Sequence, residues 1–170
     1  MNLCENDVAI REFTLEDVVR KVEWINNSEN NEYLHYDIPL SIERTTDWFV
    51  KKDNTSRLDC VIEYKGTPVG VIGLLQIDHV NKKAEFYITI GVSEYKRKGI
   101  ATTATRLMIE HAFKALKLKK IYLNVDEKNE NACKLYEKVG FKCEGVFIKD
   151  MFFKNEWINR RRYALLNEDI

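Results

Sequence analysis

The sequence predicts an α/β domain built on a mixed, mainly antiparallel central sheet with helices on both faces. Three strand-like runs, at residues 58–64, 69–77 and 83–91, follow one another and are joined by short turn sequences. A helical period beginning at Ile100 and a strand at 119–125 then form a β-α-β crossover, which makes a parallel pair. Hairpins together with one crossover predict a mixed sheet.

The remaining elements are predicted from local patterns. Before the three strands, we expect a strand at 8–13, a helix capped by Thr14 that ends in the polar run 26–31, an aromatic loop at 33–37, and a helix capped by Ser41 that reaches about residue 52. After the crossover, Ala132, Leu135, Tyr136 and Val139 have helical spacing, and Gly140 should end that helix. Two closing strands are expected at 141–153 and 157–166.

Length and composition predict one domain, residues 1–170, with an ordinary core. Lys plus Arg and Asp plus Glu both number 27, and this balance argues against a nucleic-acid or anionic-membrane partner. The four cysteines lack C-x-x-C spacing, so we expect no metal site and free thiols in the cytoplasm. No apolar run has the length of a signal peptide or a membrane span.

The segment from Lys96 to Thr102 has the form of a phosphate-binding loop that opens a helix. Gly99 and Ala101 keep the side chains small, and Arg97 and Lys98 add positive charge. A helix start presents unpaired N–H groups and a partial positive charge, which suit a diphosphate. For this segment alone, a solvated basic loop ended by glycine is the alternative.

These residues and the segment from Asn129 to Phe141 together resemble the two acetyl-CoA-binding motifs of the GNAT acyltransferase family. The second segment matches N-x-x-A-x-x-L-Y-E-K-x-G-F without a mismatch. The first segment departs from the family signature, because Lys96 stands where Arg or Gln is usual. Lysine keeps the positive charge of arginine but cannot make the bidentate contacts of a guanidinium. The resemblance extends over about residues 8–166, and within the family it is greatest to spermidine/diamine and ribosomal-protein N-terminal acetyltransferases.

The resemblance implies a GNAT-like acyl-CoA N-acyltransferase fold, acetyl-CoA as cosubstrate and no metal. It places Tyr136 near the thioester sulfur as the acid for the departing thiolate, although Tyr136 could instead be an ordinary core residue. It also implies that the strand at 83–91 carries a bulge and splays from its neighbour, so that its free edge pairs with the pantetheine arm. The residues expected to bind the cosubstrate are Ile90, Gly91, Val92, Arg97, Lys98, Gly99, Ile100, Ala101, Thr102, Asn129 and Ala132.

Glu85 is the leading candidate for the general base. It shares one face of its strand with Tyr87 and Thr89, and a carboxylate there could accept a proton from the acceptor amine. A surface glutamate on a half-exposed strand is the equal alternative.

The acceptor is expected to be a primary amine of a small molecule, of polyamine or amino-sugar type, which attacks directly in a ternary complex. Two alternatives stay open: a protein N-terminal acetyltransferase of the ribosomal-protein type, and a non-catalytic acyl-CoA sensor. A homodimer is also left open. The residues expected to bind the acceptor are Trp24, Tyr33, His35, Tyr36 and Asp37.

Overall fold

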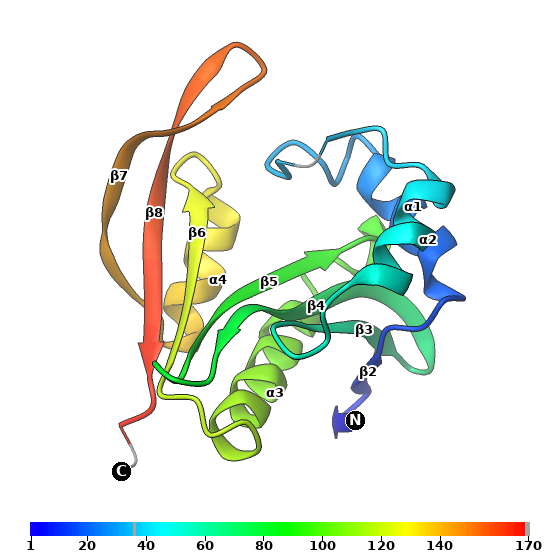
Figure 1. The fold of residues 1–170 in the computed structure, drawn as a ribbon, viewed down its shortest axis with the longest axis horizontal. Coiled ribbons are helices and arrows are strands. Elements are labelled where there is room, and N and C mark those ends of the chain that lie inside the picture. The colour runs from blue at the N-terminus through cyan, green and yellow to red at the C-terminus, as the bar shows by residue number, and fades with distance from the viewer. Residues whose placement is uncertain (36, 169–170) are drawn as a thin grey trace.

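The computed structural model describes residues 1–35 and 37–168, whose eight strands form one sheet in the order β1-β2-β3-β4-β5-β6-β8-β7 (Figure 1). Only β5 and β6 run parallel; the other neighbours are antiparallel. The mixed, mainly antiparallel sheet is therefore confirmed.

The strands are β1 (Asn2–Glu5), β2 (Val8–Glu12), β3 (Leu58–Tyr64), β4 (Thr67–Asp78), β5 (Lys83–Ile90), β6 (Lys120–Asp126), β7 (Lys142–Phe153) and β8 (Glu156–Leu166). The helices are α1 (Asp17–Asn26), α2 (Ile42–Lys51), the short 3₁₀ turn η1 (Ser93–Tyr95), α3 (Ile100–Lys114) and α4 (Glu130–Val139).

The parallel pair splits the sheet into two halves. β5 and β6 pair only from Lys83 to Glu85, opposite Lys120 to Tyr122. Beyond that point β5 stays paired with β4 as far as Ile90, and β6 stays paired with β8, so the two halves diverge (Figure 1). The backbone of β5 that faces this gap has no strand partner among the described residues, and an extended ligand could pair with it.

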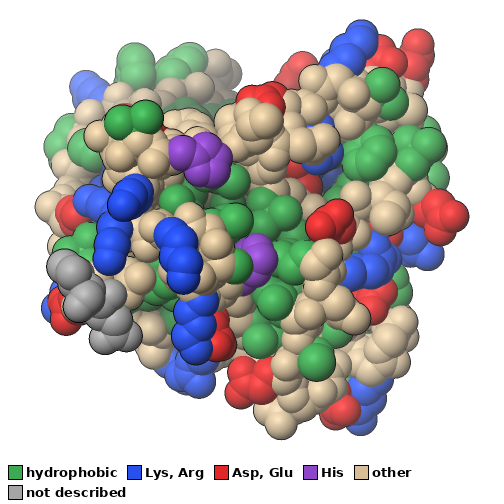
Figure 2. Space-filling view, turned by 60° about the horizontal axis from the view of Figure 1, so that its bottom comes forward, with side chains coloured by type: hydrophobic (Ala, Val, Ile, Leu, Met, Phe, Trp, Pro, Cys, Tyr) green, Lys and Arg blue, Asp and Glu red, His purple; other side chains and the backbone are tan. Residues whose placement is uncertain are grey.

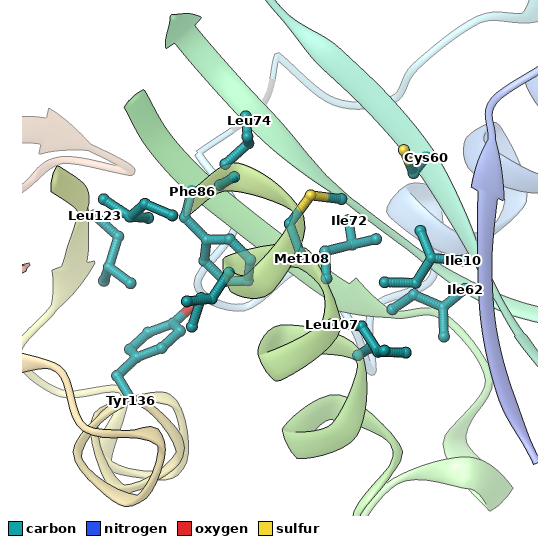
Figure 3. Close-up of a cluster of buried hydrophobic side chains, with 14 of the residues drawn as sticks. Ile10, Cys60, Ile62, Ile72, Leu74, Phe86, Leu107, Met108, Leu123 and Tyr136 are labelled. Carbon is teal, nitrogen blue, oxygen red and sulfur yellow. The ribbon is translucent and has the colours of Figure 1, made fainter. Parts of the chain in front are cut away.

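Two hydrophobic cores lie on the two faces of the sheet, because side chains alternate along each strand. On one face Ile62, Ile72 and Phe86 pack with α3 and α4. Figure 3 shows this cluster, with Met108 of α3 and Tyr136 of α4 turned toward the strands. On the other face Val61 and Val71 pack with α1 and α2. Helices on both faces are confirmed.

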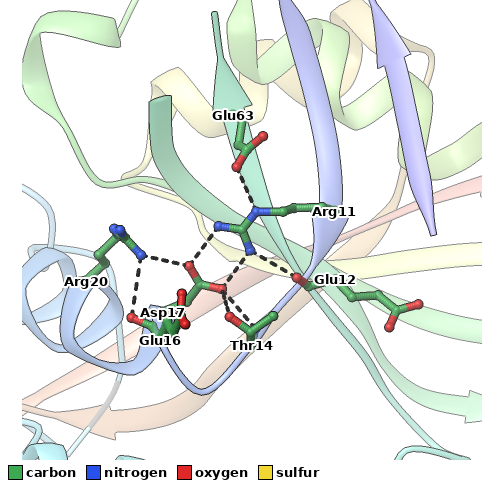
Figure 4. A network of polar contacts seen from close by, with 7 residues as sticks. All are labelled: Arg11, Glu12, Thr14, Glu16, Asp17, Arg20 and Glu63. Atoms are coloured by element: carbon green, nitrogen blue, oxygen red, sulfur yellow. Dashed lines mark hydrogen bonds and ion pairs between the residues drawn. The ribbon is translucent and has the colours of Figure 1, made fainter. Parts of the chain in front are cut away.

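A buried ion-pair network fixes the start of α1 to the sheet. Arg11 of β2 binds both carboxylate oxygens of Asp17, with Nη1–Oδ2 at 2.7 Å and Nη2–Oδ1 at 2.9 Å (Figure 4). The same guanidinium donates from Nε to Glu63 of β3 at 2.7 Å. Thr14 donates to Asp17 from its backbone N–H and its hydroxyl, and Arg20 adds a further contact at 3.1 Å. The Asp17 side chain is fully buried.

Two local predictions were wrong, and one strand was missed. The sequence prediction missed β1, which pairs antiparallel with β2. Helix α1 begins at Asp17 rather than directly after Thr14, because the Asp17 carboxylate holds Thr14 in a turn outside the helix. The bulge expected in the strand at 83–91 lies instead in β4, where Gln76 has φ 49°, while β5 keeps regular register from Glu85 to Ile90.

The surface carries charges of both signs. Figure 2 shows one face on which cationic, anionic and apolar side chains are interspersed. A hollow near the C-terminal end of α3 is lined by Glu110 and by four lysines, which are Lys82, Lys114, Lys117 and Lys119. Within residues 1–35 and 37–168, no helix has both the length and the apolar character needed to cross a membrane.

Candidate active site

A cavity of ≈ 580 Å³ lies where β5 ends, α3 begins and the loop between α1 and α2 passes over them. Three groups of residues that are distant in sequence form its wall. They are Glu29, Asn30, Glu32 and Tyr33 from the α1–α2 loop; Ile88, Thr89 and Ile90 from β5; and Lys96, Arg97, Gly99, Ala101 and Thr102 at the start of α3. Asn129, Asn131, Ala132 and Leu135 of the α4 region also line it.

The start of α3 is shaped for an anion. Arg97 has φ 63° and Gly99 has φ 79°, so the chain turns sharply before the helix. The first helical backbone bond runs from Thr103 N–H to Gly99 O, and this leaves the N–H groups of the preceding turn without helical partners. A Cβ built on Gly99 would meet no atom within 4 Å, so the backbone there is open to a ligand.

Replacing Gly99 with valine should raise the dissociation constant for CoA by roughly tenfold or more, because a β-branched residue is strained at positive φ and its methyl groups would stand in the open space beside the backbone. Calorimetric titration with CoA measures this. Gly66 has φ 78° in a turn outside the cavity, so Gly66→Val is the matched control for backbone strain. Equal losses of CoA affinity in both variants would contradict a phosphate site at Gly99.

The side chain of Asn129 caps α4: its Oδ1 accepts from Ala132 N–H at 3.2 Å. Asn129 and Ala132 both form part of the cavity wall. Gly140 ends the helix at φ 109°, as predicted. The helix start is thus positioned by the same residue that was expected to meet the cosubstrate.

Tyr136 follows Leu135 and lies one turn after Ala132, and it is in the core rather than on the cavity wall. Its ring packs against Phe86, Phe141 and Tyr163 at centroid distances of 6.3, 5.8 and 6.2 Å. Figure 3 shows its hydroxyl directed away from α4 toward Phe86 of β5. Burial raises the pKa of Tyr136, and the neighbouring Cys133 adds to that shift, so the phenol is neutral near pH 7.

Glu85 lies at the point where β5 and β6 part. Its carboxylate accepts from Gln76 Nε2 at 3.2 Å and from Asn124 Nδ2 at 3.5 Å. The Oδ1 atom of Asn124 is buried and has no hydrogen-bond partner among the described residues. A donor arriving in the gap, such as an amine N–H, would satisfy this oxygen. Glu85 is not on the wall of the cavity itself.

The expected acceptor residues are not brought together as one group. Tyr33 lies on the cavity wall, and its hydroxyl donates to Lys128 O at 3.3 Å. His35 packs edge-on against Phe153, and its Nε2 is buried without a partner in the described chain. Asp37 is exposed beside Arg44, and Tyr36 lies outside the described residues.

The expectation for Trp24 is corrected by its surroundings. Trp24 is 8% exposed and belongs to the core beneath α1 and α2. A Cβ built on Gly91 would lie 2.1 Å from the Trp24 ring, so glycine is required at the end of β5 for this packing. Trp24 therefore packs in the core against the end of β5 and does not line the cavity.

Several residues expected at the cosubstrate lie beside the cavity wall rather than on it. These are Gly91, Val92, Lys98 and Ile100. Ile100 is buried, and the ammonium of Lys98 lies 5.3 Å from the centre of the Tyr95 ring. Gly91, Val92 and Ile100 could offer a ligand their backbone groups, and Lys98, which is exposed, could add the charge of its ammonium. No group of three His, Cys, Asp or Glu residues in the described part of the chain is arranged to hold a metal ion.

Sequence reasoning missed Asn30 as a residue of the wall, which Glu29 and Glu32 also line. The signal was the asparagine-rich stretch at 26–31, which was expected to end the first helix. Asn26 binds both backbone groups of Leu40, with Nδ2–O at 2.9 Å and N–Oδ1 at 2.7 Å, and thereby closes the base of the loop. The asparagines build an ordered loop that presents two acidic residues to the cavity.

A split mixed sheet, a sharp turn with open backbone at the start of α3 and a buried tyrosine on α4 are together typical of the acyl-CoA N-acyltransferase folds. Residues 7–142 match the family described as acetyltransferase (GNAT) domain. The chain belongs to the GNAT family, as the two sequence motifs indicated.

Known relatives and solved structures agree with this assignment. The chain is 39% identical over 105 residues to spermidine N(1)-acetyltransferase of Escherichia coli K12, a match that covers 62% of this chain and 56% of that protein's length. The structure of spermidine N-acetyltransferase from Vibrio cholerae in complex with CoA and spermine superposes with a TM-score of 0.88, at 25% identity and with 95% and 96% of the two chains covered. A dodecameric structure of the same Vibrio enzyme, at 24% identity, has a TM-score of 0.82 over 95% of each chain and shows the shared fold.

Proposed function

We propose that the chain is an acetyl-CoA-dependent N-acetyltransferase that acts on a primary amine of a small molecule, of polyamine or amino-sugar type, by direct attack in a ternary complex. The observation that carries this proposal is the cavity itself. It combines an anion-binding helix start, the unpaired edge of β5 and an acidic loop in one space. These are the features needed to bind a diphosphate-bearing thioester beside a cationic amine.

The residues at this site fit acetyl-CoA. The turn at Arg97 and Gly99 offers backbone N–H groups and one guanidinium to the diphosphate. The edge of β5 near Thr89 and Ile90 offers backbone partners to an extended amide-containing arm. When bound, acetyl-CoA supplies the acetyl group as a thioester. A thiol of pKa about 8.5 is a fair leaving group, so acid assistance is useful but not essential.

Glu85 is proposed to receive the proton of the amine, directly or through water. An amine of pKa about 10.4 costs roughly 4.6 kcal/mol to deprotonate at pH 7, while an α-amine of pKa near 8 costs about 1.4 kcal/mol. The need for a base is thus greater for a polyamine or a lysine-like amine than for a protein N-terminus. The contacts from Gln76 and Asn124 hold the carboxylate at the gap between the two halves of the sheet.

The acceptor is proposed to be cationic, because Glu29 and Glu32 lie on the cavity wall. A polyamine carries positive charges that two carboxylates could meet. The names of the Escherichia and Vibrio relatives, spermidine N-acetyltransferases, support the same substrate class for this chain. Asp37, the third acidic residue of this loop, is exposed beside Arg44 and is not on the cavity wall.

The test is release of CoA from acetyl-CoA in the presence of a panel of amines: spermidine, an amino sugar and a short peptide with a free N-terminus. We expect turnover with spermidine or the amino sugar and at least tenfold slower turnover with the peptide. Fastest turnover with the peptide would favour the N-terminal acetyltransferase instead. Tight binding of acetyl-CoA with no turnover on any amine would favour a sensor module and contradict catalysis.

The assembly and compartment are also proposed. β7 is an edge strand with large apolar side chains exposed at Val146, Phe147 and Ile148, and Phe152 and Trp157 are exposed near the tip of its hairpin. Such an edge favours association of copies, for which the dodecamer of the Vibrio enzyme is a precedent, and a homodimer is the smallest such unit. All four cysteines are free, which supports a reducing compartment such as the cytoplasm.

A further inference from the structure

The acceptor-side loop is tied to the phosphate-binding turn through one lysine. Lys96 donates from Nζ to Glu29 O at 3.1 Å and to Asn30 Oδ1 at 2.6 Å. A second link runs from the Ser93 hydroxyl to the Glu29 carboxylate. The two segments are more than sixty residues apart in sequence, yet they meet along one side of the cavity.

Asn30 continues the link into the sheet and into α1. Its Nδ2 donates to Gly91 O at 2.8 Å and to Trp24 O at 2.9 Å. An ammonium only donates and a carbonyl oxygen only accepts, so these three partners fix which way the Asn30 amide points. The side chain of Asn30 therefore joins the end of β5, the end of α1 and Lys96 in one network.

Lys96 is directed differently from the two cations that follow it. Its side chain is half-buried and its ammonium is bound by the α1–α2 loop, whereas Arg97 and Lys98 are exposed. Positive charge for a diphosphate is thus available from Arg97 and Lys98 without Lys96. At the position where Arg or Gln is usual in the family, Lys96 directs its ammonium across to the α1–α2 loop.

We propose that Lys96 and Asn30 are positioning residues that couple the two substrates, so that a diphosphate bound at the start of α3 stabilises the acidic wall that meets the amine. This inference rests on the proposed function, since it takes the cavity to bind both acetyl-CoA and an amine. A coupling of this kind is reciprocal, because each ligand changes the affinity for the other by the same factor. Neither residue touches the reacting atoms.

The first test is hydrogen exchange of residues 27–35 with CoA alone, which needs no turnover. Saturating CoA should slow exchange there by roughly tenfold in the parent chain and by less than twofold in Lys96→Met and Asn30→Ala. Lys98→Met removes the same charge from the exposed side of the turn, so it should bind CoA more weakly but keep the protection at saturation. Unchanged protection in Lys96→Met and Asn30→Ala, or equal loss in Lys98→Met, overturns the inference.

The second test separates KM from kcat with spermidine as the acceptor. Lys96→Met and Asn30→Ala should raise the KM for spermidine by roughly tenfold with a smaller change in kcat, and Lys96→Arg should restore most of the affinity because Arg also donates to both oxygens. Loss of kcat alone, or no rescue by Arg, contradicts a positioning role. If the parent chain does not bind CoA, the proposed function fails as well; if CoA binds without protecting residues 27–35, only the coupling fails.

Discussion

Replacing Tyr136 with phenylalanine should lower kcat by roughly 10²–10⁴-fold while changing the affinity for acetyl-CoA by less than twofold. Phenylalanine keeps the ring that packs against Phe86, Phe141 and Tyr163, so only the hydroxyl is lost. Because burial raises the pKa of Tyr136 above its ordinary value of about 10, the hydroxyl keeps its proton across the neutral range and can donate a hydrogen bond to the departing thiolate. Single-turnover kinetics with acetyl-CoA and spermidine, together with a CoA titration, measure both quantities.

Tyr163→Phe is the matched control for this prediction. Tyr163 is also a buried tyrosine of the same cluster, but its hydroxyl donates to Glu137 at 2.6 Å instead of facing β5. It should lose stability and keep kcat within a few-fold. The pH profile offers an independent check: no loss of activity below about pH 10 should come from Tyr136, since the neutral phenol is the donor. Equal losses of turnover and cosubstrate affinity in Tyr136→Phe would remove the acid from the mechanism.

The parts of this site that were predictable are those encoded by neighbouring residues. The spacing from Ala132 to Val139, ended by Gly140, defines α4 with no information from elsewhere in the chain. The same holds for Ser41, whose hydroxyl accepts from Arg44 N–H at 3.2 Å as an N-cap. Local hydrogen bonds close such elements, and residues within one turn determine them.

The parts that were not predictable depend on contacts between distant residues. Trp24 is an aromatic residue of the kind that often lines pockets. Only its packing on Gly91 shows that it belongs to the core. In the sequence, Lys96 cannot be told apart from the two cations that follow it. The direction of its side chain is set by Asn30, sixty-six residues earlier. The start of α1 was misplaced because of a contact that is closer in sequence: Asp17 is held by Arg11, six residues earlier on β2.

The ion pair between Arg11 and Asp17 supplies the largest expected effect on stability. Arg11→Met should lower the free energy of unfolding at pH 7 by about 3–5 kcal/mol, since it leaves the fully buried carboxylate of Asp17 without its bidentate partner. Arg20, which is partly exposed, and Thr14 still contact Asp17, which favours the lower end of that range. Urea denaturation measures the change. Arg20→Met removes the outer of the two arginines and is the matched control, with an expected cost below about 1 kcal/mol.

The pH dependence of this effect follows from the sign of the Asp17 shift. Burial opposes ionisation of Asp17, but hydrogen bonds from Arg11 and Thr14 outweigh it and hold the pKa below the ordinary value. A carboxyl group with a lowered pKa stabilises the fold above its unfolded pKa of about 3.9, and the contribution is lost as pH falls through the folded pKa. In Arg11→Met only burial and weaker contacts remain, so the pKa of Asp17 should rise and protonation should relieve the buried charge. The difference in unfolding free energy between the two chains should therefore shrink between pH 7 and pH 4; a difference that stays constant over this range would mean that Arg11 acts through packing of its side chain and not through the charge of Asp17.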